Sequence, residues 1–188
     1  MNYKAMTYRI TTDKPRRPFS PIAAFFAALA LLLMSALNAP AASPSVAVQL
    51  DITHAAPRGV EKPTARRILA DYRFAWTNLA RAVAANSAGP TQGLFTGTAK
   101  KWLDATIASQ RQSGLVTKYL NQNHNLEAIF YAPEGDVMEL HDTAQYQMQI
   151  FDGGKLIYDQ PVVMHYVVLM TPGADRWLIR QLQPVAKF

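Results

Sequence analysis

Two stretches of the chain repeat their apolar residues at the spacing of an α-helix. In the first, apolar residues recur every three or four positions over 68–83. Pro63 lies just before them and suits the first turn of a helix, where backbone N–H groups have no partner within the helix. In the second, TGTAKKWLDATIASQRQSG over 96–114, the terminal Gly114 suits the residue that ends a helix. The pattern predicts one helix from Pro63 to about residues 86–90, and a second that ends at Gly114.

Beyond Gly114 the apolar residues alternate with polar ones, which is the spacing of β-strands. The predicted strands cover 126–131, 138–151, 155–158, 162–170 and 176–182. Asp152-Gly153-Gly154 is a strong hairpin signal between two of them, and Pro161 interrupts the following run. Helices followed by a meander of strands predict an α+β domain with helices packed on a curved antiparallel sheet.

The longest apolar stretch, PIAAFFAALALLLMSALNAPAA, fills residues 21–42 and contains no charged side chain. As a helix it would be ~33 Å long, enough to cross the hydrocarbon core of a bilayer. Two interpretations stay open at this point. The segment is either an uncleaved transmembrane anchor or a signal peptide cut near Ala41, where Ala39-Pro40-Ala41 supplies small residues.

Positive charge gathers ahead of the apolar stretch. Residues 1–42 carry five Lys/Arg and one Asp, whereas the rest of the chain carries 14 Lys/Arg and 12 Asp/Glu. The positive-inside rule therefore keeps residues 1–20 cytoplasmic and places the C-terminal domain in the periplasm, either on a single-pass anchor or released by cleavage. The nearly balanced body, without a basic stripe interleaved with aromatics, predicts no nucleic-acid partner.

Between the apolar stretch and the first helix, residues 43–62 show no helical period and three prolines lie in or just after them. We expect an extended linker or arm here, followed by one folded domain over 63–188. The chain has no cysteine, which excludes disulfides and cysteine-based zinc sites. Phosphate-loop, dinucleotide, GxSxG and HExxH motifs are absent, and the four histidines lack metal-ligand spacing, so neither cofactor nor metal is expected.

Asp142 is the one carboxylate in an otherwise apolar row of the strand 138–151. On a concave sheet face it would lose solvent and could serve as a general base, with His165 or Tyr146 as its partner. The alternative is a bulge or strand end around His141 and Thr143 that turns the carboxylate outward. Since a lone buried carboxylate is costly, we expect Asp142 at a bend or pocket rim and His165 as an ordinary core residue.

Four further side chains share the row with Asp142 and would line an apolar ligand pocket, if the sheet encloses one: Met138, Leu140, Tyr146 and Met148.

Several segments together look familiar. The order Tyr72, Trp76 and Leu79, then LFTGTAKKWL, KYLNQNHNLEAIFY and DRWLIRQL, resembles the cone-shaped NTF2-like superfamily over residues 64–184. Within it the chain is most similar to the intermembrane-space domain of plastid and cyanobacterial division proteins, which also follows a single membrane span. Cell division does not carry over, because the long N-terminal regions of those proteins have no counterpart here. The resemblance implies either a pocket enzyme using Asp or His, or a non-catalytic domain that binds partner peptides.

These observations favour a non-catalytic, membrane-anchored binding or assembly domain, an accessory subunit of a larger membrane complex. The absence of a complete catalytic set speaks against an enzyme. Two alternatives stay open, namely an isomerase, cyclase or hydrolase for a small apolar substrate, and a carrier of an apolar ligand. The expected partners are the membrane and other proteins of a membrane complex, and the sequence does not determine the oligomeric state.

Overall fold

The computed structural model describes residues 45–188. The basic segment 1–20 and the predicted anchor or signal sequence at 21–42 lie outside the described residues. Within 45–188, neither helix combines the length and the apolar character that a membrane span requires.

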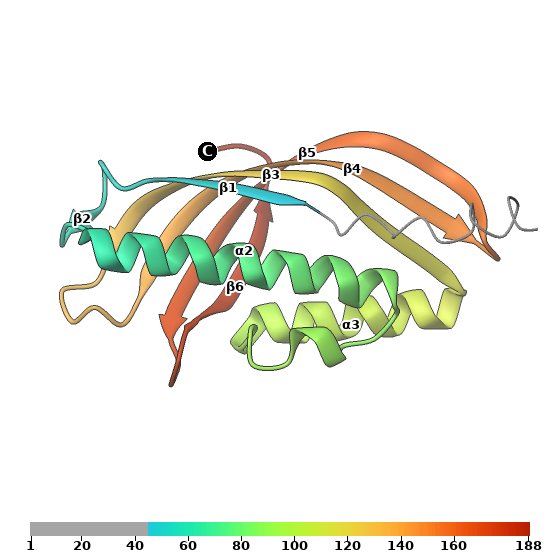
Figure 1. The fold of residues 1–188 in the computed structure, drawn as a ribbon, viewed down its shortest axis with the longest axis horizontal. Helices are drawn as coiled ribbons and strands as arrows, with labels where there is room; N and C mark the ends of the chain where they lie inside the picture. Colours follow the sequence, from blue (N-terminus) through green and yellow to red (C-terminus); the bar gives the residue numbers. More distant parts are fainter. Residues whose placement is uncertain (1–44) are drawn as a thin grey trace, which may run out of the picture. The chain divides into compact units, whose positions relative to one another are not determined.

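A sheet of six strands carries both long helices on one face, and no helix of residues 45–188 covers the other face (Figure 1). The elements are β1 Val46–Asp51, β2 Ala56–Pro57, α2 Lys62–Ala84, a 3-10 turn at Gly89–Thr91, α3 Gly97–Ser113, β3 Leu115–Tyr131, β4 Met138–Asp152, β5 Lys155–Pro172 and β6 Trp177–Val185. The strand order is β1-β3-β4-β5-β6, with β2 also pairing with β3. The predicted α+β fold with helices on one sheet face is therefore confirmed.

Both helices follow the sequence pattern. Pro63 lies in the first turn of α2, where the backbone N–H has no partner within the helix in any case. Gly114 ends α3 in the left-handed conformation, with φ of 71°, which glycine adopts without the strain that a Cβ would bring. Both helices thus begin and end close to the positions predicted from their apolar period.

The strand β3 begins at Leu115, well ahead of the predicted start at residue 126. Its pairing with β4 shifts between Leu120 and Asn123, and Asn121 has a positive φ of 52°. This β-bulge changes which residues face the helices: Thr117 is buried before it and His124 after it. The simple alternation is broken here, so the polar run around the bulge does not look like a strand in the sequence.

The strand β5 continues through Pro161, where we expected an interruption. Pro161 pairs with Gln147 of β4, but β6 joins β5 only from His165 onward. One side of β5 is therefore free at Pro161 among residues 45–188, and a proline without an N–H is tolerated on such an edge.

Residues 43–62, expected as an extended linker, contain a strand of the sheet. β1 is extended, but it pairs in parallel with β3, from Val46 beside Gln122 to Asp51 beside Glu127. Val48 is buried in the main hydrophobic core, which fixes this segment to the domain. The sheet is thus mixed: β1 and β2 run parallel to β3, while β3 to β6 form the predicted antiparallel meander.

The core fills the space between α2, α3 and the sheet. Its fully buried large side chains include Ile68, Tyr72, Trp76, Leu79, Leu103, Met138, Leu140, Met170 and Ile179. Each such side chain contributes roughly 1.5–3 kcal/mol by leaving water. The amphipathic helices and the strands are held mainly by this shared burial.

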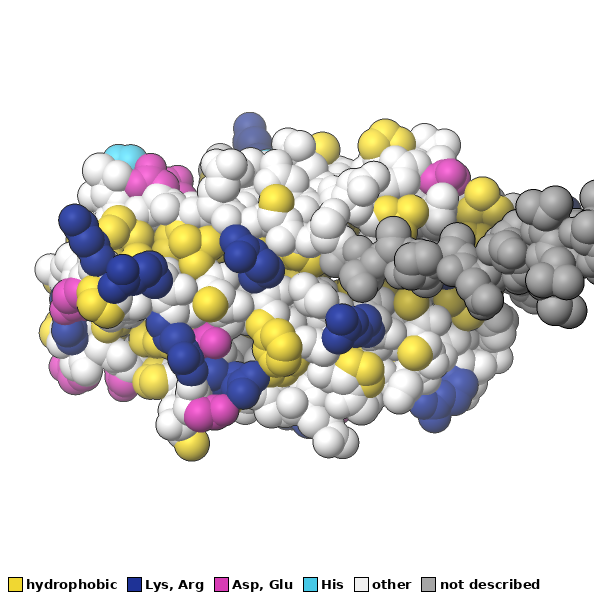
Figure 2. All heavy atoms as spheres, in the orientation of Figure 1, with side chains coloured by type: hydrophobic (Ala, Val, Ile, Leu, Met, Phe, Trp, Pro, Cys, Tyr) yellow, Lys and Arg dark blue, Asp and Glu magenta, His cyan; other side chains and the backbone are white. Residues whose placement is uncertain are grey.

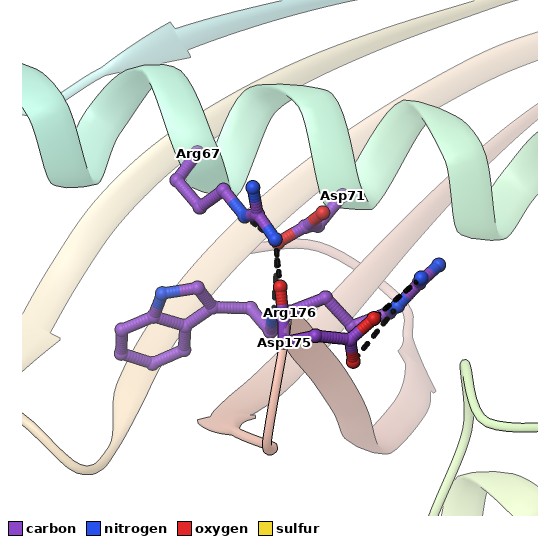
Figure 3. Close-up of polar contacts among 5 residues, drawn as sticks. Arg67, Asp71, Asp175 and Arg176 are labelled. Carbon is purple, nitrogen blue, oxygen red and sulfur yellow. Dashed lines mark hydrogen bonds and ion pairs between the residues drawn. The ribbon is translucent and has the colours of Figure 1, made fainter.

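A polar clamp fixes α2 to the turn between β5 and β6 (Figure 3). Arg67 donates to the Asp71 carboxylate, 3.0 Å away, and to the backbone carbonyl of Asp175. The Asp71 carboxylate also accepts the backbone N–H of Trp177 at 2.8 Å. The side chain of Arg176 turns back onto Asp175. Two charged residues of α2 are therefore occupied in holding the helix on the sheet.

Candidate functional site

Asp142 is fully buried, with no exposed surface. It lies in the middle of β4, opposite Leu126 of β3 and Tyr166 of β5. Both pairings run without a break through this point, so there is no bulge to turn the carboxylate outward. The expectation of a bend or pocket rim is therefore wrong, because the carboxylate has found partners that the sequence did not reveal.

Two buried side chains bind the same oxygen of Asp142. The Tyr72 hydroxyl donates to Oδ2 at 2.7 Å, and Nδ1 of His124 lies 2.8 Å from it. Tyr72 comes from α2 and His124 from β3, so the contact joins three elements that are distant in sequence. The ring of Trp76 lies against the imidazole, with centroids 4.3 Å apart and a tilt of 43°. Paired burial removes the objection to an isolated buried carboxylate.

Several polar atoms around this contact have no hydrogen-bond partner. They are Nε1 of Trp76, Nε2 and Oε1 of Gln122, Nε2 of His124 and Oδ1 of Asp142. We call Tyr72, Trp76, Gln122, His124 and Asp142 the buried polar cluster. Buried polar groups are nearly always hydrogen-bonded, and each one left unpaired costs about 1–3 kcal/mol. Trp76, His124 and Asp142 are in direct contact, so their unpaired atoms supply donors and acceptors for a water molecule or a small polar ligand in one place.

Three tyrosines of the sheet, Tyr119, Tyr146 and Tyr166, extend the polar region beyond Tyr72 on the helix-covered face. Burial, followed by the charge of Asp142, raises the pKa of Tyr72 well above its usual value. Burial also raises the pKa of Tyr119 to about 12 and those of Tyr146 and Tyr166 above their usual range. The last two hydroxyls lie 3.3 Å apart. All four are therefore neutral hydroxyls near neutral pH, and act as hydrogen-bond donors and acceptors, not as bases.

The alternative pairing of Asp142 with His165 does not occur, and His165 is only partly buried, not the core residue that we expected. His165 lies opposite Thr143 on the other face of the sheet, and its Nδ1 is 3.2 Å from the Thr143 hydroxyl. Tyr146 does share a face with Asp142, but its hydroxyl contacts Tyr166. Of the three candidates, only Asp142 belongs to the buried polar cluster, and its imidazole partner is His124.

The side chains predicted to line an apolar pocket pack in the core. Met138 and Leu140 have no exposed surface, Tyr146 has 7%, and Met148 packs against them from a partly buried position. These four side chains do not contribute to any of three hollows on the protein surface. They stabilise the fold in this structure, and a ligand space among them remains a prediction.

Three hollows of about 300–390 Å³ open on the surface. The largest lies beside the start of α3 and is lined in part by Thr98, Lys101 and Arg180. Another lies on the outer sheet face between Glu127 and His141. Its lining includes His141 and Thr143, which flank Asp142 in β4 but leave the sheet on the opposite face, and no residue of the buried polar cluster lines any of the three hollows. No group of three or more His, Cys, Asp or Glu suited to a metal ion occurs within residues 45–188.

The sequence pattern did not identify His124 and Gln122 as buried residues of the site. Both stand in the polar run NQNHN, which has no apolar alternation. The bulge at Asn121 is what turns Gln122 and His124 toward the helices on the next residues. An asparagine, which adopts a positive φ more readily than other side chains, was the only signal for it.

No protein-family model matches this sequence, and no curated protein matches it. Among solved structures, the chain is similar to the intermembrane space region of chloroplast protein ARC6, described as a crystal structure. The identity is 16%, the TM-score is 0.48, and the match covers 70% of this chain and 100% of the other. A likeness this distant concerns the course of the backbone and carries no argument about superfamily, membrane attachment or activity.

Proposed function

We propose that the protein is a membrane-tethered, non-catalytic binding and assembly domain that serves as an accessory subunit of a membrane protein complex. The observation that carries the proposal is the free segment of β5, residues 155–164, which pairs with β4 on one side and with no strand of residues 45–188 on the other. Its exposed apolar side chains are Leu156, Ile157, Tyr158 and Val163, at 44%, 54%, 38% and 59%. An unpaired apolar edge is a ready site for a strand of another protein.

The buried polar cluster supports a role without catalysis. Tyr72, His124 and Asp142 have no exposed surface, and α2 covers them. A general acid or base must come within hydrogen-bond reach of the proton it transfers. With the carboxylate and the imidazole closed to solvent, the pair instead links α2, β3 and β4.

The apolar segment 21–42 supports the tether. It ends four residues before Val46, where β1 begins. At most ~14 Å of extended chain would then separate the membrane surface from the domain. A domain held this close to a bilayer meets membrane proteins far more often than a free one, because tethering raises the effective concentration.

The test is to recover the full chain from native membranes in mild detergent by a C-terminal tag, and to identify its N-terminal residue and its companions. Ile157→Lys with Val163→Lys places two charges on the free segment of β5. Ala105→Lys with Ala108→Lys is the matched control, because both alanines are exposed on α3. We expect intact Met1, companions that the β5 variant loses at least tenfold, and an unchanged control.

Two results would contradict the proposal. A chain that begins near Ala42 and is recovered without membranes would make it a secreted domain. If the wild type and the β5 variant co-purify with the same proteins in equal amounts, the free segment of β5 is not the binding surface.

A second candidate is a small-molecule site, whether of a carrier or of an isomerase, cyclase or hydrolase. It is favoured by the unpaired atoms of the buried polar cluster, which would have to open toward solvent to admit a ligand. Solvent extraction of the purified full chain followed by mass spectrometry tests it. A molecule held by the wild type and by His141→Gln, but not by Asp142→Asn, would support a site at the cluster, and an empty wild type would exclude it.

A further inference from the structure

The charge of the domain is unevenly distributed. Residues 45–188 carry 14 Lys/Arg and 12 Asp/Glu, which nearly balance. The helix α2 alone carries five Lys/Arg against the single Asp71. The small net charge of residues 45–188 does not reveal that α2 is basic, because the acidic residues that balance it belong to other elements.

Four of the five basic residues of α2 are free. Arg67 is held in the clamp with Asp71 and Asp175 (Figure 3). The others are exposed and form no ion pair within residues 45–188: Lys62, Arg66, Arg73 and Arg81. At 100° per residue they fall within about 100° of arc and span ~28 Å. We call them the basic face of α2, and Lys and Arg side chains are visible along this helix in Figure 2.

The opposite face of the sheet has the other sign. Glu127, Glu139 and Asp159 lie there, in the outward row of β3, β4 and β5 respectively, with Lys118 as a cation on the same side. The two faces therefore differ in electrostatic potential although the domain is nearly neutral. Such a domain orients near an anionic surface so that its basic side faces that surface.

We propose that the basic face of α2 docks on the anionic phospholipid headgroups of the membrane to which the chain is tethered. The inference rests on the tether in the proposed function. Only three residues separate the apolar segment from β1, and β1 packs on the same core as α2 through Val48. Charge complementarity then acts over a short distance, close to the Debye length of 8–10 Å.

Lipid fits this surface better than nucleic acid. Single-stranded nucleic acid binds where bases can stack on exposed aromatic rings between the basic groups. The exposed aromatic residue of α2 is Phe74, and the guanidinium of Arg176 already lies 5.3 Å from its ring centroid. A smooth row of cations without a stacking platform suits headgroup phosphates.

Each basic residue at an anionic membrane surface shifts binding by about fivefold. Removing two of them should lower the ratio of docked to undocked domains roughly 25-fold, and reversing their sign should lower it further. Arg66 and Arg73 are the pair to change, because both are exposed in the middle of the row.

The experiment uses the full chain in proteoliposomes. Because the protein has no cysteine, Ala70→Cys between the two arginines accepts one fluorophore, and Gln145→Cys labels the opposite sheet face. Quencher attached to lipid headgroups reports proximity to the bilayer, in phosphatidylcholine alone and mixed with phosphatidylglycerol. We expect phosphatidylglycerol to increase quenching at residue 70 and not at residue 145.

Arg66→Glu with Arg73→Glu should abolish that increase. Lys155→Glu with Lys187→Glu, two exposed residues away from α2, is the control with the same change of charge, and should retain it. Equal loss in both variants would show a response to net charge alone and overturn the assignment to α2.

Flotation separates the two proposals. A chain washed off phosphatidylcholine vesicles at alkaline pH has no tether, and the lipid assignment then fails with the proposed function. A chain that stays in the vesicles but shows no effect of phosphatidylglycerol at residue 70 overturns the lipid assignment alone. The lipid assignment is also overturned if duplex DNA binding depends on Arg66 and Arg73 while the response to phosphatidylglycerol does not.

Discussion

His141 and Asp142 are neighbours in β4, yet their side chains leave the strand on opposite faces of the sheet. On the inner face, Asp142 has no exposed surface and binds Tyr72 and His124. On the outer face, His141 stacks on Phe188 with centroids 4.1 Å apart, and its Nε2 lies 3.5 Å from Glu139. Both faces thus contain a histidine, a carboxylate and an aromatic ring.

The difference between them is access to water. Outside, solvent screens the carboxylate and imidazole, so their contact contributes little to stability. Inside, each group has exchanged water for a few protein partners, and losing one partner leaves the others without a substitute. The same residue types are therefore structurally decisive on one face and nearly dispensable on the other, which the following substitutions test.

Asp142→Ala should have the largest effect, lowering the free energy of unfolding by about 3–5 kcal/mol, because it leaves Tyr72 and His124 buried without their acceptor. Urea denaturation of the wild type and of each variant measures this loss. Asp142→Asn, which keeps the shape and one oxygen, should lose less. His141→Ala on the outer face should cost less than about 1 kcal/mol. Equal losses at both positions would remove the distinction between the faces.

The second largest effect should come from alkaline pH, which should lower the free energy of unfolding through the buried tyrosines of the inner face. An unfolded tyrosine releases its proton near pH 10, while burial raises the pKa of Tyr119 to about 12 in the folded protein. Between these values the folded state binds more protons, so the stabilisation is complete below pH 10 and is lost as the pH rises toward 12. The loss attributable to this residue is about 2–3 kcal/mol.

The measurement is the free energy of unfolding against pH for wild type and Tyr119→Phe. The variant should show a shallower fall between pH 10 and 12. Tyr158→Phe is the control, because Tyr158 is exposed. A fall of the same steepness in Tyr119→Phe would assign the alkaline loss to other groups.

Tyr72→Phe should cost about 1.5–3 kcal/mol, the usual range for a hydrogen bond to a charged group. The ring remains in place, so the change removes the hydroxyl bond to Asp142 and little else. Thermal and urea unfolding both report it, again against Tyr158→Phe. A loss below about 0.5 kcal/mol would mean that Asp142 does not depend on this donor.

Phe188→Ala should have the smallest effect, about 0.5 kcal/mol. Phe188 stacks on His141 but is 50% exposed, so truncating it removes one solvated aromatic contact. Urea denaturation checks this as well. A loss comparable to that of Asp142→Ala would show that the outer face also holds the sheet together.

Much of the fold follows from the sequence itself. Apolar residues at helical spacing mark α2 and α3, since a helix must bury one continuous stripe. Asp152-Gly153-Gly154 marks the hairpin between β4 and β5, where both glycines have positive φ. Period two along β4 assigns Asp142 to the same face as Met138 and Leu140. These are local properties, which neighbouring residues determine together.

Which strand lies beside which, and in what register, required the tertiary structure. The parallel pairing of β1 with β3 joins segments more than 70 residues apart, and nothing in either segment specifies the other. The partner of Asp142 is His124 and not His165, because the bulge at Asn121 turns His124 inward while the β4–β5 register turns His165 outward. Periodicity assigns a side chain to a face, but its neighbours across the sheet depend on how the strands align, and that alignment is set by packing of the whole core.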